Sequence, residues 1–157
     1  MSARPHSWRL RLGRYSQTDQ VYLITAVTHQ RQPFFADWRA GRLLVHQLRK
    51  AQDAGWADSL AWVVMPDHFH WLMQLKDREL SAVMHRIKCQ TANKVNVYLR
   101  RSGQFWHRGF HDRAIRDEGD RLPAARYIIA NPLRAGLVTR VQDYPLWDCI
   151  WLDRREY

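Results

Sequence analysis

The sequence predicts an α+β fold in which one antiparallel sheet of four strands carries helices on one face, and an additional helix follows towards the C-terminus. Segments rich in β-branched and aromatic residues alternate with amphipathic segments in the order β-α-β-β-α-β. Only two residues separate the second strand from the third, which predicts an antiparallel hairpin. Hydrophobic residues make up 46% of the 157 residues, a fraction typical of a folded protein.

The first half of the chain contains three predicted strands and one predicted helix. Residues 20–30 (QVYLITAVTHQ) have the composition of a strand. Residues 37–54 repeat apolar side chains at helical spacing. The strands predicted for 60–65 and 68–75 are joined by Pro66-Asp67, which forms the turn of the hairpin.

The second half supplies the remaining elements. Residues 80–98 form a long amphipathic helix that ends at the glycine-containing stretch RSGQ. A short strand is predicted for 112–117 and a last helix for about 120–131. This helix tolerates Pro123 in its first turn and stops near Asn131-Pro132, because a proline disfavours helical geometry in the residue before it. The complete order matches the ferredoxin-like split βαβ arrangement.

The organisation of the chain predicts a single domain over residues 1–157. It has no internal repeats and no Pro-, Gly- or Ser-rich linker. The N-terminal residues 1–18 are basic and irregular, and residues 139–157 form an aromatic tail without clean periodicity. Two cysteines, no apolar leader and no apolar run of ~20 residues lead us to expect a cytoplasmic protein without membrane contact, associated with the nucleoid when bound to DNA.

The charge of the chain favours polyanions as partners. There are 25 Lys and Arg residues against 15 Asp and Glu residues, giving a net charge of +10. Such a balance is typical of proteins that bind nucleic acid. A basic protein without such a partner remains the alternative at this point.

Two histidines interrupt the apolar stretch VVMPDHFHWLMQL, residues 63–75. Side chains alternate along a strand, so His68 and His70 share a face while Phe69 points into the core. Their Cα atoms are expected roughly 6.6 Å apart, near enough for both rings to bind one cation. Two surface histidines on a half-exposed sheet would give the same pattern, and Asp67 either orients an imidazole or only forms the turn.

A third ligand and a nucleophile are candidates on the last predicted helix. Tyr127 and Asn131 lie at positions i and i+4 and therefore share a helix face. The amide oxygen of Asn131 is a neutral metal ligand, and the phenol of Tyr127 becomes a nucleophile when it loses its proton. Tyr98 is the competing tyrosine, although its place on an apolar helix face favours core packing. His107 and His111 are the competing third ligands.

These residues and five longer blocks resemble one family. In chain order the blocks are GRYSQTDQVYLITAVTHQRQPFF, AWVVMPDHFHWLMQL, RIKCQTANKVN, FWHRGFHDRAIRDEGD and YIIANPLRAGLV. They resemble the REP-associated tyrosine transposases, a group of single-tyrosine HUH transposases. The resemblance implies a Mg²⁺ or Mn²⁺ ion bound by His68, His70 and Asn131. It also implies that Tyr127 attacks single-stranded DNA to form a 5′-phosphotyrosine intermediate.

The same resemblance implies the substrate. The family binds REP elements, palindromes that fold into hairpins, and its members act as monomers or homodimers. We expect basic residues to contact phosphates, Trp106 to stack on an unpaired base, and two loop histidines to contact the substrate. The expected DNA-binding set is Arg4, Arg9, Arg11, Arg14, Arg86, Lys88, Trp106, His107 and His111.

Two other functions are consistent with parts of this pattern. A catalytically silent protein of the same fold would bind hairpin DNA or RNA through its basic, aromatic surface. A replication initiator or relaxase would use the same strand-breaking chemistry. Binding alone does not require the complete set of His68, His70, Tyr127 and Asn131, so this set favours the enzyme.

Overall fold

The computed structural model describes residues 16–151. They contain a five-stranded antiparallel sheet in the order β4-β1-β3-β2-β5. The predicted α+β fold is confirmed, with one correction to the strand count: a fifth short strand extends the sheet beside β2. The strands are β1 (Val21–Val27), β2 (Ala57–Met65), β3 (His68–Leu75), β4 (His111–Ile115) and β5 (Trp147–Cys149).

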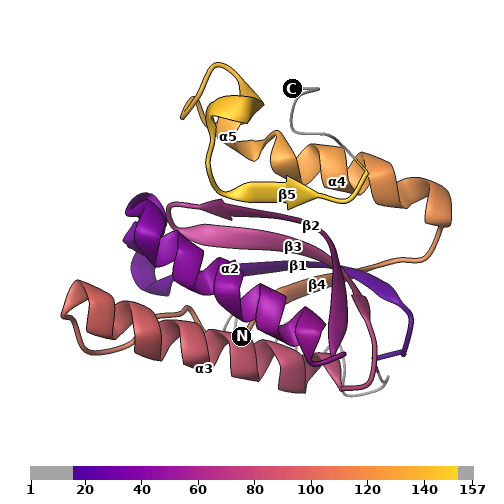
Figure 1. Cartoon of the computed structure of the whole chain (residues 1–157), viewed down its shortest axis with the longest axis horizontal. Helices are drawn as coiled ribbons and strands as arrows, with labels where there is room; N and C mark the ends of the chain where they lie inside the picture. Colours follow the sequence, from indigo (N-terminus) through magenta and orange to yellow (C-terminus); the bar gives the residue numbers. More distant parts are fainter. Residues whose placement is uncertain (1–15, 152–157) are drawn as a thin grey trace, which may run out of the picture.

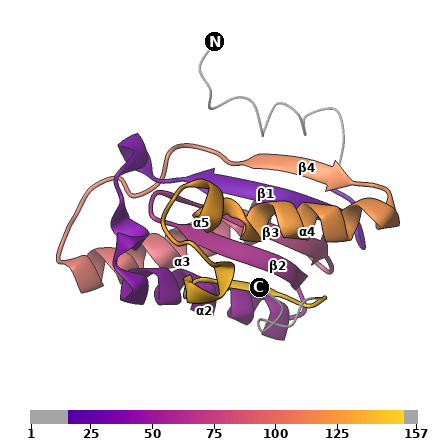
Figure 2. The same ribbon diagram turned by 90° about the horizontal axis from the view of Figure 1, so that it is seen from above.

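Helices cover both faces of the sheet (Figures 1 and 2). The helices α2 (Trp38–Asp53) and α3 (Leu80–Leu99) lie on one face, as predicted. The additional helix, α4 (Arg121–Ile129), lies on the other face and is followed by the short α5 (Asn131–Arg134). No helix between residues 16 and 151 has the length and hydropathy needed to cross a bilayer.

The junction between α4 and α5 sets the direction of the residues that follow Tyr127. The helix α4 ends at Ile129, and α5 begins at Asn131 with a proline in its first turn. Ala130 keeps right-handed helical backbone angles between them. The Arg134 N–H donates to the Ala130 carbonyl at 3.0 Å. The chain therefore continues as a nearly helical path, which brings residue 134 back over the end of α4.

The strands differ in how much of each face is covered. Residues 60–65 of β2 are all buried, because α2 packs on one side of β2 and α4 on the other. Along β1, by contrast, buried residues alternate with partly exposed ones, and Thr25 is among the exposed set. The face of β1 and β3 that lies beside α4 is therefore partly open, and His68 and His70 occupy that open part.

The opposite face of β3 contributes to the core. Phe69 and Trp71 are fully buried, and the Phe69 ring packs 5.6 Å from the Trp106 ring. The Trp71 indole N–H donates to Ser59 Oγ at 2.8 Å, which satisfies its one polar group. Burial of each large apolar side chain contributes about 1.5–3 kcal/mol to folding. The expectation that Phe69 enters the core is confirmed.

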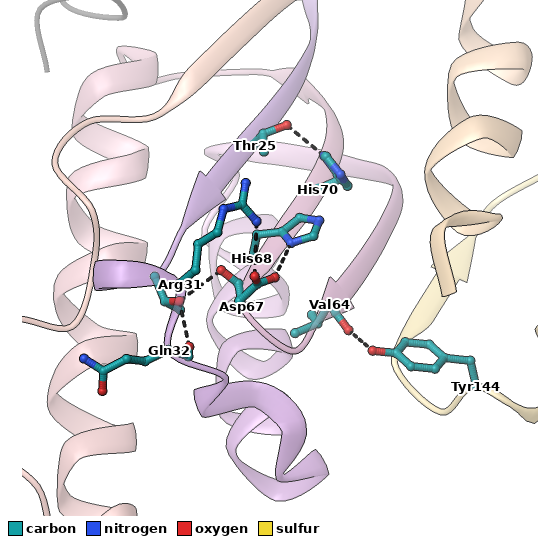
Figure 3. Close-up of polar contacts among 9 residues, drawn as sticks. Thr25, Arg31, Gln32, Val64, Asp67, His68, His70 and Tyr144 are labelled. Atoms are coloured by element: carbon teal, nitrogen blue, oxygen red, sulfur yellow. Dashed lines mark hydrogen bonds and ion pairs between the residues drawn. The ribbon is translucent and has the colours of Figure 1, made fainter. Parts of the chain in front are cut away.

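Part of the aromatic C-terminal tail packs into the fold. The Tyr144 hydroxyl donates to the Val64 carbonyl (Figure 3), and the Trp147 indole donates to the Val141 carbonyl at 3.0 Å. Burial raises the pKa of Tyr144 to about 12. Leu146, between them, is 2% exposed. These residues fix β5 against β2, so this part of the tail completes the sheet.

Candidate active site

Each of the two histidine rings is held in place through its own Nδ1 atom. The centroids of His68 and His70 lie 5.0 Å apart. His68 Nδ1 is 2.7 Å from Asp67 Oδ1, and His70 Nδ1 is 2.7 Å from Thr25 Oγ1. Figure 3 shows both contacts, the first at the start of β3 and the second between β1 and β3. Because Nδ1 is occupied in each ring, Nε2 is the atom that each imidazole offers to a further ligand.

Asp67 has a structural role beyond the hairpin turn. Its Oδ2 atom pairs with Arg31 Nη1 at 3.1 Å, while its Oδ1 atom contacts His68. Partial burial alone would raise the pKa of Asp67. The hydrogen bonds with His68 and Arg31 outweigh that effect and lower the pKa below its ordinary value. A carboxylate at this place accepts the Nδ1 proton of His68 and so leaves the lone pair on Nε2.

His70 is neutral at physiological pH. Burial lowers the pKa of His70 to about 4, and positive charge on His68 and Arg134 acts in the same direction. A neutral imidazole is the form that binds a metal ion.

Arg134 contacts both Tyr127 and Asn131, and the sequence does not predict a role for it in the site. The Tyr127 side chain is 62% exposed, and the Arg134 guanidinium carbon lies 4.1 Å from the centre of its ring. Arg134 Nη2 donates to the Tyr127 carbonyl at 2.8 Å and to Asn131 Oδ1 at 2.6 Å. Arg134 therefore lies across the helix face that Tyr127 and Asn131 share.

The donor set available to a metal ion is limited. Among residues 16–151, no three His, Cys, Asp or Glu side chains come together as a metal site. The idea that His107 or His111 completes a site of three histidines is therefore wrong. A metal ion at His68 and His70 needs a third ligand of another type, and an amide oxygen such as that of Asn131 is one.

A groove lies beside Tyr127. It has a volume of about 480 Å³ and runs between α4 and the β1–β4 edge of the sheet. Its apolar lining includes Leu23 and Pro123, and its cationic lining consists of Arg113 and Arg116, with Asp120 as the acidic member. The combination of apolar surface and guanidinium groups suits the bases and phosphates of a nucleic-acid strand.

Three of the expected DNA-binding residues are exposed. Arg86 on α3, His107 and His111 all reach the surface. The register places His111 opposite Thr25, which is itself opposite His70. Residues opposite each other in an antiparallel sheet share a face, so His111 flanks the histidine pair two strands away.

Two other expected contacts are engaged within the protein. Trp106 is only 7% exposed, and its indole N–H donates to the Lys88 carbonyl at 2.9 Å. This burial contradicts the expectation of an exposed ring for base stacking. Lys88 Nζ donates to the carbonyls of His107 and Gly109 at 3.2 and 2.6 Å, and burial lowers the pKa of Lys88 to about 8. Lys88 therefore braces the loop rather than presenting a fully solvated cation.

The remaining predictions for DNA contacts lie outside the described residues. These are Arg4, Arg9, Arg11 and Arg14, in the basic N-terminal segment.

Tyr98, the competing tyrosine, differs from its expected core position. It is 40% exposed, and its hydroxyl donates to Asp37 Oδ2 at 2.9 Å. This hydrogen bond is the main reason why the pKa of Tyr98 is raised. Asp37 also caps the first turn of α2 by accepting from the Arg39 N–H at 2.9 Å. Tyr98 thus ties α3 to the start of α2.

Comparison with known proteins gives a family match that includes His68, His70, Tyr127 and Asn131. The model for the family described as "Transposase IS200 like" matches residues 16–131. Among curated proteins, a REP-associated tyrosine transposase of Escherichia coli K12 is 32% identical over 87 residues, which are 54% of this chain and 50% of that protein. A candidate REP-associated tyrosine transposase of Haemophilus influenzae is 31% identical over 100 residues, 56% of each chain. This chain therefore spans about half the length of the curated relatives that it matches.

Solved structures share the same architecture. A REP-associated tyrosine transposase bound to a REP hairpin superposes with a TM-score of 0.72 at 26% identity, over 85% of this chain and 79% of the other. A protein of Deinococcus radiodurans R1 described as a candidate transposase gives a TM-score of 0.50 at 21% identity, over 73% of this chain and 91% of the other. The second likeness concerns the fold alone.

Proposed function

Because this chain belongs to the IS200-like transposase family, we propose that it is a single-strand DNA endonuclease and strand transferase that acts on REP-type hairpins. The proposal includes Tyr127 as the nucleophile and a covalent 5′-phosphotyrosine intermediate. The observation that carries it is the position of Arg134, which contacts Tyr127 and Asn131 on the helix side and acts on the pKa of His70 on the sheet side. Arg134 thus contacts the Tyr127 ring and the Asn131 amide, and its charge acts on His70.

The donor atoms fit a divalent ion, Mg²⁺ or Mn²⁺. His68 and His70 offer Nε2 atoms from rings fixed through Nδ1. Asn131 Oδ1 is already within hydrogen-bonding distance of a positive group, and Nδ2 of the same amide is buried without a hydrogen-bond partner among the residues that the structure describes. An ion bound by these three residues would polarise the scissile phosphate and offset the charge that builds up in the transition state.

Tyr127 would perform the bond exchange. Its phenol oxygen loses its proton to solvent and attacks the phosphorus. The bond between phosphorus and the 3′ oxygen breaks, and that oxygen takes up a proton to become a free 3′-hydroxyl. The 5′ phosphate stays on Tyr127 until a 3′-hydroxyl attacks it and releases the phenol. Each step replaces one phosphoester bond at the phosphorus by another, so rejoining requires no ATP.

The substrate side of the proposal rests on the groove and on the relatives. A related structure holds a REP hairpin. The groove beside Tyr127 offers Arg113 and Arg116 for phosphates and an apolar wall for bases. We therefore assign a hairpin with a single-stranded flank as the substrate, with the flank in the groove.

The test is incubation of the protein with end-labelled single-stranded hairpins taken from the flanks of its own gene, with and without Mn²⁺. We expect a covalent protein–DNA band on a denaturing gel that depends on Mn²⁺. The Tyr127→Phe variant should lose the band and keep its affinity for the hairpin, because the ring remains and only the nucleophilic oxygen is removed.

The matched control is Tyr98→Phe, which removes the phenol oxygen of the other helical tyrosine and should leave the covalent band in place. Full cleavage by Tyr127→Phe would exclude Tyr127 as the nucleophile. Tight hairpin binding by the unmodified protein without any covalent band would favour the silent binding protein.

A further inference from the structure

Arg134 is hydrogen-bonded to an oxygen atom that the proposed metal site requires. Its Nη2 atom is 2.6 Å from Asn131 Oδ1, a short charge-assisted hydrogen bond. The same nitrogen donates to the Tyr127 carbonyl at 2.8 Å, and the guanidinium lies over the Tyr127 ring. One arginine thus contacts both the proposed nucleophile and the proposed amide ligand.

Arg134 and a divalent ion would be like charges at the same oxygen. The amide oxygen of Asn131 is the group that Arg134 now holds, and the Asn131 Nδ2 atom gains no hydrogen bond from this arrangement among the described residues. Repulsion between cations at such short distance is strong where solvent is partly excluded. A bound ion would therefore displace the guanidinium from Asn131.

The displaced guanidinium of Arg134 would have a phosphate as an alternative partner nearby. The Arg134 side chain is exposed, so it has space to move. Its guanidinium presents several N–H donors in a flat fork that matches two oxygens of a phosphate. The scissile phosphate, when Tyr127 attacks it, must lie next to the ring that Arg134 already covers.

We propose that Arg134 is a positioning residue with two alternative partners: it holds Asn131 and Tyr127 together in the metal-free protein, and it moves from Asn131 to the scissile phosphate when metal ion and DNA bind. This inference rests on the proposed function, because it assumes the ion and the phosphate. The competing explanation is that Arg134, at the end of α5, is purely structural, since arginines near a helix C-terminus commonly bind helix carbonyls such as that of Tyr127.

The two explanations predict opposite changes in metal affinity for Arg134→Met. If Arg134 competes with the ion, its removal tightens Mn²⁺ binding to the DNA-free protein by roughly threefold or more, because a like charge is removed. If Arg134 only supports Asn131, its removal weakens Mn²⁺ binding. The measurement is the electron paramagnetic resonance signal of free Mn²⁺ during a titration, with circular dichroism to confirm that the variant is folded.

Three further variants complete the experiment, two of them at arginines and the third at His68. Arg126→Met removes a positive charge from an exposed position of α4 and should change the Mn²⁺ affinity less than Arg134→Met does. Arg134→Lys keeps the charge but lacks the fork, so it should keep an affinity near that of the unchanged protein. Both Arg134 variants should cleave at least about tenfold more slowly in a single turnover at saturating Mn²⁺, because a donor to the phosphate is lost.

Unchanged or weaker Mn²⁺ binding by folded Arg134→Met would overturn this inference and leave the proposed function in place. A third protein, His68→Ala, tests the function itself. If the unchanged protein bound no Mn²⁺, or if His68→Ala bound it equally well, the metal site and this inference would both be overturned.

Discussion

At the scale of single residues, the orientation of the histidine rings depends on Asp67 and Thr25. Asp67 holds Nδ1 of His68, and its second oxygen pairs with Arg31. In metal sites, partners of this kind change metal affinity by about 10–100-fold. We expect Asp67→Ala to weaken Mn²⁺ binding by a factor in this range, as measured by the same titration of free Mn²⁺.

The control for this prediction is Arg31→Met. It removes the ion pair of Asp67 with Arg31 but keeps the carboxylate beside His68. Its effect on Mn²⁺ affinity should therefore be smaller than that of Asp67→Ala. Equal affinities for the unchanged protein and folded Asp67→Ala would mean that the carboxylate does not orient the ring.

Sequence spacing alone could suggest some of these residues but not others. His68 and His70 follow from alternation along a strand, and Tyr127 and Asn131 from helical periodicity, both of which are local properties. Thr25 reaches His70 only through the pairing of β1 with β3, a long-range register. Arg134 follows Asn131 at i+3, but the sequence predicts that the helix stops near Pro132. In the structure α5 continues to Arg134, so the two residues share a face.

At the scale of elements, the position of the α2 helix depends on a glycine. Gly41 is buried, and a Cβ atom at this position would overlap Leu146 Cδ1. Alanine is favoured over glycine inside a helix by up to about 1 kcal/mol. Since Leu146 is only 2% exposed and has little room to move, we expect the clash to dominate and Gly41→Ala to destabilise the fold by about 1–3 kcal/mol.

A double-mutant cycle measures this clash directly. In a Leu146→Ala background the obstructing methyl group is absent, so Gly41→Ala should cost less or become stabilising. The four free energies of unfolding come from urea denaturation. The same cost of Gly41→Ala in both backgrounds would show that Leu146 is not the obstacle.

The strand β5, which follows Leu146 directly, could not be predicted from its own sequence. A strand of three residues has too little alternation to be recognised, and Trp147–Cys149 is defined by its pairing with β2. The same holds for Trp106, which is expected from the sequence to stack on an unpaired base, whereas its indole packs on Phe69. The longer elements could be predicted because each carries its own periodic pattern.

At the scale of the whole molecule, positive charge would determine how the proposed DNA binding responds to salt. The net charge of +10 and the arginines of the groove predict that hairpin affinity falls steeply as salt rises, because each phosphate contact releases bound counterions. The slope of log affinity against log salt is about −0.7 for each phosphate contacted on a single strand. Fluorescence anisotropy of a labelled hairpin over a range of salt concentrations gives this slope.

Variants of single arginines test whether the groove or the overall charge of the protein attracts the DNA. If the single-stranded flank lies in the groove, Arg113→Ala and Arg116→Ala should each reduce the slope by about one contact, or roughly 0.7. Arg42→Ala removes an equal charge from the exposed side of α2, on the opposite face of the sheet, and should leave the slope nearly unchanged. Equal losses for all three variants would assign the attraction to overall charge, and the groove would then have no special part in holding the DNA.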